Sequence, residues 1–148
     1  MHDLKLELGC GHKLEPGFTG IDKLDFSKEL PTGKFILRDI EYQGLPFCDD
    51  AALEIRAFNI FEHVNNLEFV LNECWRVLRK DGLLYFQVPH WGSKQRGQDP
   101  THVRGFSEYT FTHYFGEGMY NFKPWFIESI NEMEKHQGII EGRMRPNK

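Results

Sequence analysis

The sequence has no apolar run approaching the ~18 residues that a membrane-spanning helix needs, and its first residues lack the basic and apolar parts of a signal peptide. It also lacks an excess of positive charge. The 18 Lys and Arg against 22 Asp and Glu leave a net charge of −4, which argues against a nucleic-acid surface. We therefore expect neither a membrane nor a nucleic acid as a partner.

Cysteine is scarce. Cys10, Cys48 and Cys74 are odd in number and widely spaced, so we expect free thiols and a cytoplasmic location. No repeat, low-complexity tract or linker divides the chain. Its 148 residues, 40% hydrophobic and 27% charged, are predicted to form a single globular domain over residues 1–148.

What the chain does contain is a series of short apolar segments. These segments predict five β-strands, at residues 4–8, 18–22, 35–40, 52–59 and 83–88. Apolar residues at helical spacing predict a helix between the last two strands, from Leu67 to Leu78. Asn65 with Glu68 resembles a capping box at its start, and Gly82 is expected to end it. Strand, helix and strand predict a βαβ unit.

The first two connections, at 9–18 and 23–34, are too short for full crossover helices, so one face of the sheet should be thinly covered. A helix is predicted at 107–115, and 126–134 with 139–144 are predicted to form a hairpin through Gln137 and Gly138. The fold class is therefore α/β: a minimal Rossmann-like, doubly wound and mostly parallel sheet with short early crossovers and a C-terminal β-hairpin.

The first strand ends at a pair of glycines. Gly9 and Gly11 permit a sharp turn and the close approach of a ligand, and Asp22 ends the next strand, where a carboxylate can bind a ribose diol. This pairing predicts a cofactor that carries a nucleoside. A nicotinamide cofactor is disfavoured, because the third glycine of its fingerprint is missing and Asp22 follows Gly11 by only eleven residues instead of ~20.

Further polar residues follow the other strands, at the edge where open α/β sheets bind ligands. An ordered series of motifs resembles the class I S-adenosylmethionine-dependent methyltransferases, especially their small bacterial and phage members. The motifs are Glu7–Gly11, Gly20–Asp22, Arg38–Ile40, Leu45–Phe47, Glu62–Val64, Arg76–Gly82, Val88–His90 and Asp99–Arg104. The first glycine motif departs from the family pattern, because His12 stands where a third glycine is common.

The resemblance implies S-adenosylmethionine as the cofactor and methyl transfer to a small-molecule or carbohydrate-like acceptor by in-line displacement. It implies the cofactor-binding residues Glu7, Gly9, Cys10, Gly11, Asp22, Asp39, Ile40 and Asn59. His90 would serve as a general base if the acceptor must lose a proton, with loop capping as an equal alternative. Trp91, His102 and Arg104 are candidate substrate contacts.

Several alternatives stay open. His63 is interpreted as packing near a helix start, and His90, Asp99 and His102 show no ligand spacing of a known metal site, so no metal is predicted. The short crossovers motivate a second hypothesis, that of a non-catalytic methyltransferase-fold protein that binds the cofactor or a partner subunit. The aromatic region from Tyr120 to Ile130 is predicted to form a weak homodimer.

Overall fold

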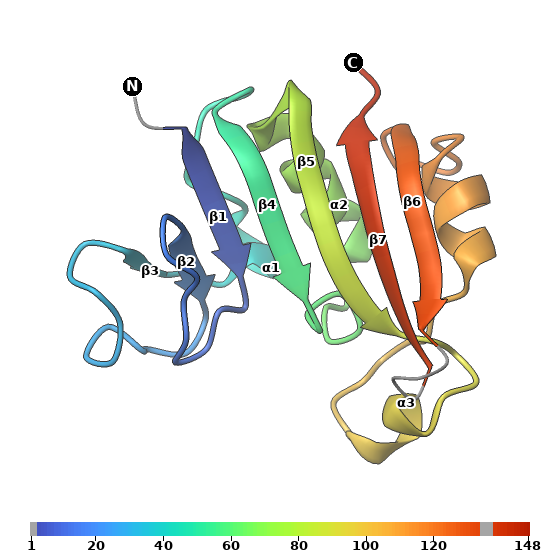
Figure 1. Ribbon diagram of the computed structural model, residues 1–148, viewed down its shortest axis with the longest axis horizontal. Helices are drawn as coiled ribbons and strands as arrows, with labels where there is room; N and C mark the ends of the chain where they lie inside the picture. Colours follow the sequence, from blue (N-terminus) through green and yellow to red (C-terminus); the bar gives the residue numbers. More distant parts are fainter. Residues whose placement is uncertain (1–2, 134–137) are drawn as a thin grey trace.

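The computed structural model describes residues 3–133 and 138–148. Seven strands form one sheet in the order β3-β2-β1-β4-β5-β7-β6. Their bounds are β1 Leu4–Leu8, β2 Thr19–Asp22, β3 Phe35–Leu37, β4 Ala52–Phe58, β5 Leu78–Pro89, β6 Trp125–Met133 and β7 Ile139–Pro146. The first five are parallel, and β7 runs antiparallel to both β5 and β6 (Figure 1). The predicted α/β fold and the closing hairpin are thus confirmed; its turn lies outside the described residues.

The helices are few and short. They are α1 Ile40–Gln43, α2 Leu67–Val77, α3 Lys94–Gln98 and a π-helical segment, η1, at Thr110–Phe115. No helix occurs within residues 9–18 or 23–34, as the short connections predict. No helix among the described residues is long and apolar enough to cross a membrane.

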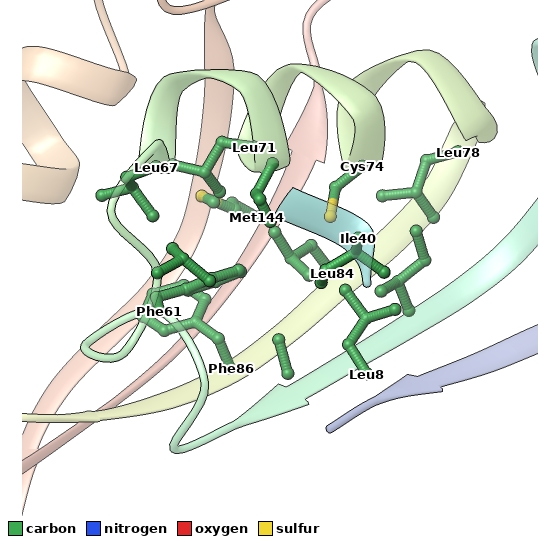
Figure 2. Close-up of a cluster of buried hydrophobic side chains, with 14 of the residues drawn as sticks. Leu8, Ile40, Phe61, Leu67, Leu71, Cys74, Leu78, Leu84, Phe86 and Met144 are labelled. Atoms are coloured by element: carbon green, nitrogen blue, oxygen red, sulfur yellow. The ribbon is translucent and has the colours of Figure 1, made fainter. Parts of the chain in front are cut away.

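The core lies between the sheet and α2. Leu67, Leu71 and Cys74 of α2 point at the strands (Figure 2). The buried side chains of the strands form rows that run across the sheet from one strand to the next. One such row joins Leu6, Ile55, Leu84 and Met144, and the next joins Leu8, Ala57, Phe86 and Gly142. All of these residues are buried, so the apolar stripe of α2 and one face of the sheet close a single core.

The opposite face of the sheet carries no helix among the described residues, and in Figure 1 none crosses its front. Polar side chains occupy this helix-free face and interact with one another. Lys5 lies 3.3 Å from Glu54, Arg56 donates to Glu54 at 3.0 Å, and the Arg143 guanidinium lies 5.0 Å from the Tyr85 ring centroid. A sheet with one solvated face shows this alternation of apolar and polar residues.

Several predicted boundaries were wrong. The fifth strand, expected at 83–88, spans Leu78–Pro89, and the helix expected at 107–115 is the π-helical segment Thr110–Phe115. The third strand stops at Leu37, because Asp39 caps α1 and Ile40 begins it. Asn66 rather than Asn65 caps α2, through a bond from Phe69 N to its side chain. The helix ends at Val77, and Gly82 lies within β5, where a Cβ would come within 3.0 Å of the Ala52 carbonyl oxygen. Gly82 therefore permits a close approach of β5 to β4 at an irregular register.

Candidate functional site

The turn after β1 is built around two glycines in the left-handed region. Gly9 has φ +62° and Gly11 has φ +57°, and Gly9 N donates to the Ile21 carbonyl at 2.8 Å. A Cβ at Gly9 would lie only 2.5 Å from Cδ1 of Ile60. The backbone angle therefore favours glycine at this position, and a Cβ would also displace the end of the Ile60 side chain.

Asp22 ties this turn to the end of β2. Its Oδ2 accepts a hydrogen bond from Gly11 N at 3.0 Å, and its Oδ1 accepts one from Leu24 N at 2.9 Å. A carboxylate has about four lone-pair positions, so both oxygens keep capacity for a further donor. The carboxylate is thereby held in place with room to bind hydroxyl groups.

Asp22 lines a cavity of about 400 Å³, here called the cofactor cavity. Asp39 lies on its wall together with apolar side chains, and its Oδ1 accepts from Glu41 N at 3.1 Å. The apolar members of the wall are Ile21, Leu24, Ile40, Ile60 and Val64. An apolar hollow of this size with two fixed carboxylates fits a nucleoside, whose base is planar and whose sugar offers hydroxyl donors. The residues present thus fit the nucleoside half of S-adenosylmethionine.

The structure brings Gly9, Asp22, Asp39 and Ile40 together on this cavity. Gly11 lies behind Asp22 and contacts it through its amide.

Three other predicted residues lie elsewhere. Glu7 is on the helix-free face of the sheet, where its Oε2 accepts from Glu15 N at 3.2 Å. Cys10 is buried against Gly20, and this burial raises the pKa of its thiol to about 11. Asn59 lines a second cavity. The cofactor role of these three residues stays a prediction.

The second cavity, of about 650 Å³, adjoins the first and is here called the acceptor cavity. Asn59 and Pro89 line it from the carboxyl ends of β4 and β5, and Asp99 and His102 from the loop after α3. His63 lines both cavities. It follows β4 closely, so the two hollows meet at the edge of the parallel strands.

Glu62, on the wall of the acceptor cavity, has a side chain that is only 1% exposed. Its Oε2 is buried and has no hydrogen-bond partner among the described residues. Burial away from water raises the pKa of this carboxyl to about 7, with a smaller contribution from the charge of Asp99. A buried carboxylate without a partner is costly, so this group makes the acceptor cavity a candidate functional site.

Two imidazoles lie beside Glu62. The rings of His63 and His102 meet edge to face with centroids 4.6 Å apart, and Nε2 of His102 lies 3.9 Å from Oε1 of Glu62. Burial, followed by the neighbouring His102, lowers the pKa of His63, so its ring is neutral at pH 7. Glu62, His63 and His102 together form the Glu62 cluster.

The predicted catalytic and substrate-binding residues differ in whether they line a cavity. His102 lines the acceptor cavity, whereas His90, Trp91 and Arg104 are not among the lining residues of either cavity. His90 Nδ1 accepts from Gly92 N at 3.2 Å, and Trp91 is 63% exposed. Arg104 donates to the carbonyls of Phe61, Val64 and Asn65, and so fixes the turn that carries Glu62 and His63. Its guanidinium is used within the protein.

Sequence reasoning did not assign a site role to Glu62, which lines the acceptor cavity, or to His63, which lines both cavities. The signal was present, because an acid followed by histidine stands directly after the fourth predicted strand. What could not be read was the approach of Thr101 and His102 from a loop almost forty residues away.

The comparisons with known proteins agree with this geometry. The model of a family described as the methyltransferase domain matches residues 6–86, and no curated protein matches the chain. The protein paired with the Trm112 methyltransferase activator in a complex from Haloferax volcanii has a TM-score of 0.77 at 13% identity. That match covers 98% of this chain and 83% of the other.

Two similar structures contain S-adenosylhomocysteine. The N-methyltransferase NodS of Bradyrhizobium japonicum has a TM-score of 0.70 at 17% identity, over 99% of this chain and 79% of its own. The 1,6-didemethyltoxoflavin-N1-methyltransferase of Burkholderia thailandensis, which also holds 1,6-didemethyltoxoflavin, has a TM-score of 0.69 at 11% identity, over 98% and 71%. Likeness at such identities shows the fold, and the family match over more than half of the chain shows the family. The chain belongs to the methyltransferase-domain family of class I S-adenosylmethionine-dependent methyltransferases.

Proposed function

We propose that the chain transfers a methyl group from S-adenosylmethionine to a small-molecule or carbohydrate-like acceptor bound in the acceptor cavity. One observation carries this proposal: His63 lines both cavities, so an acceptor there adjoins the cofactor. The bound cofactor supplies a methyl group that its sulfonium has already activated. The toxoflavin-precursor methyltransferase, which holds a small molecule, supports the acceptor class.

The contribution of the protein is mainly one of position. Asp22, held by Gly11 N and Leu24 N, accepts hydrogen bonds from the ribose hydroxyls, while Ile40 and Ile60 give the base an apolar wall. The acceptor cavity would align a nucleophile with the methyl group. Fixed alignment of two reactants removes several kcal/mol from a barrier, so little further chemical assistance is needed.

General-base catalysis by His90 remains a prediction. Because Gly92 N donates to Nδ1 of His90, the lone pair of that nitrogen is already engaged in the neutral ring. Nε2 then carries the proton. Replacement of His90 by alanine, with turnover and cofactor affinity measured separately, tests the role: a base would lower turnover alone.

The ribose contact is tested by calorimetry with S-adenosylhomocysteine. Asp22→Asn should weaken its binding by roughly 10- to 100-fold, since hydrogen bonds to a charged group are worth ~1.5–3 kcal/mol. Asp25→Asn is the matched control, because Asp25 is an exposed acid that accepts from Ser27 N and does not line the cofactor cavity. Unchanged affinity of the Asp22 variant would refute the ribose contact.

A second function, binding of cofactor or a partner subunit without catalysis, is favoured by one observation: one sheet face has no helical layer among the described residues. One assay distinguishes the two proposed functions. Radioactive methyl transfer from S-adenosylmethionine is measured over a panel of sugars, hydroxy acids and amines. Transfer to any member supports the proposed enzyme, and tight S-adenosylhomocysteine binding with no transfer supports the second function.

A further inference from the structure

The Glu62 cluster has the chemistry of a metal site. One donor atom from each of Glu62, His63 and His102 lies within 4.8 Å of the other two. The carboxylate among them is buried, and its Oε2 has no partner among the described residues. Nε2 of His102, at 3.9 Å from Oε1, is too distant for a hydrogen bond. A cation between the three side chains would supply the missing counter-charge.

The hydrogen bonds of His63 prepare it as a ligand. The hydroxyl of Thr101 donates its only hydrogen to Oδ1 of Asp99 at 2.6 Å, so the contact of 2.9 Å between Thr101 Oγ1 and His63 Nδ1 requires a proton on that nitrogen. In the neutral ring, Nε2 therefore keeps its lone pair. Metal-bound histidines are oriented by such a second hydrogen bond, commonly to a carboxylate.

His102 is prepared in the same way by a different partner. Its Nδ1 lies 3.2 Å from the carbonyl oxygen of Arg96, which can only accept, so Nδ1 carries the proton. Nε2 is left with its lone pair and faces both Glu62 and Asp99, at 3.9 and 3.8 Å. Nε2 of His102 thus keeps its lone pair beside the buried carboxylate, and one ring nitrogen of His63 lies within 4.8 Å of a donor atom of each of the other two side chains.

We propose that Glu62, His63 and His102 bind a divalent transition-metal ion of the zinc class at the wall of the acceptor cavity. Two imidazoles and one carboxylate form a ligand set of three, which leaves a coordination position open. Zn–N and Zn–O bonds of about 2.0–2.2 Å place neighbouring ligand atoms roughly 3.4 Å apart, so the side chains need only small movements towards the ion. Glu62, with its 1% exposure, would no longer be an uncompensated charge.

The open position would face the acceptor cavity, because all three ligands line that cavity. This part of the inference rests on the proposed function. The ion favours acceptors that offer an oxygen or nitrogen ligand, such as vicinal hydroxyls or a hydroxy acid, and it lowers the pKa of a bound hydroxyl. The chemical class of acceptor is therefore narrowed to chelating small molecules.

The experiment uses untagged full-length chain, stripped of metal by a chelator and titrated with Zn²⁺ in a calorimeter. We expect one strong site per chain, and a loss of at least about 100-fold in affinity in Glu62→Gln and His102→Asn. Thr101→Val should weaken binding by ~10-fold through the orientation of His63 alone. The matched control is His113→Gln, since His113 lies in η1, outside the cluster.

Co²⁺ in place of Zn²⁺ gives a second readout, a visible absorption band that should appear in the wild type and vanish in Glu62→Gln. Thermal melts of each variant without metal separate lost binding from lost folding. Absence of a strong site, or equal affinity in wild type, Glu62→Gln, Thr101→Val and His113→Gln, would overturn the proposal. S-adenosylhomocysteine binding should survive in Glu62→Gln, so failure of the cofactor site and failure of the metal site are separable.

Discussion

Arg104 shows how a single half-buried cation can shape the site without lining either cavity. Its guanidinium donates to Phe61 O at 3.0 Å, to Val64 O and to Asn65 O at 3.0 Å. These carbonyls belong to the turn that carries Glu62 and His63. Arg104 is therefore a positioning residue. Its predicted contact with the substrate remains a prediction, and Arg104 lines neither cavity.

We predict that Arg104→Gln lowers the free energy of unfolding by about 2–3 kcal/mol, because up to three carbonyls lose a charged donor. Urea denaturation followed by circular dichroism gives this value. Arg143→Gln is the control: Arg143 lies on the helix-free face over Tyr85, and its loss should cost less than about 1 kcal/mol. Equal destabilisation by the two substitutions would contradict the role given to Arg104.

At this scale the sequence predicted the cofactor side of the site better than the acceptor side. Gly9, Asp22, Asp39 and Ile40 follow neighbouring parallel strands, and strand order alone brings them to one edge. Contact between His63 and Thr101, in contrast, depends on the path of the loop after α3. A loop has no periodic pattern from which its path could be read.

Among the elements, α2 shows both the strength and the limit of periodicity. Its apolar stripe predicts the buried face correctly, since Leu67, Val70, Leu71, Cys74 and Val77 are all buried. Its ends depend on single hydrogen bonds instead. Asn65 N and Asn66 N both donate to Oε1 of Glu41 in α1, a distant contact that fixes the cap one residue later than predicted.

We predict that Asn66→Ala lowers the free energy of unfolding by about 1 kcal/mol, the usual cost of a lost N-cap. Asn65→Ala should change it little, because the backbone N–H of Asn65, not its side chain, makes the recorded bond. Thermal or urea unfolding of the two variants measures the difference. A larger loss of unfolding free energy in Asn65→Ala than in Asn66→Ala would instead support Asn65 as the N-cap, as the sequence pattern predicts.

At the scale of the whole molecule, helices cover one face of the sheet, and the other face carries none among residues 3–133 and 138–148 (Figure 1). The short connections after β1 and β2 predict this. Glu54 and Arg56, whose charges made the fourth predicted strand look irregular, lie on the helix-free face on either side of the buried Ile55. The insertion of β7 between β5 and β6 was not predictable from a hairpin pattern. It requires the long return from β5 to the edge strand β6, which is set by packing of η1 and of the buried Trp125.

We propose that the chain forms a weak homodimer through residues 120–130, as predicted from the sequence. Tyr120 is 78% exposed and Phe126 58% exposed, and β6 is an edge strand of the sheet. Light scattering over a concentration series should show a rising mean mass that Phe126→Glu abolishes. The control is Tyr42→Glu, since Tyr42 is an aromatic residue on α1 that is 77% exposed. A constant monomer mass at the highest concentration would contradict the dimer.

The wall shared by the two hollows has a consequence for inhibition. Since His63 lines both cavities, a short tether could join an adenosine group on one side to a chelating group on the other. Each half would hold its neighbour at a high effective concentration, so the joined compound gains affinity beyond either fragment. Such a compound would be a bisubstrate ligand. The tether length that gives the highest affinity would measure the distance between the bound cofactor and the bound acceptor.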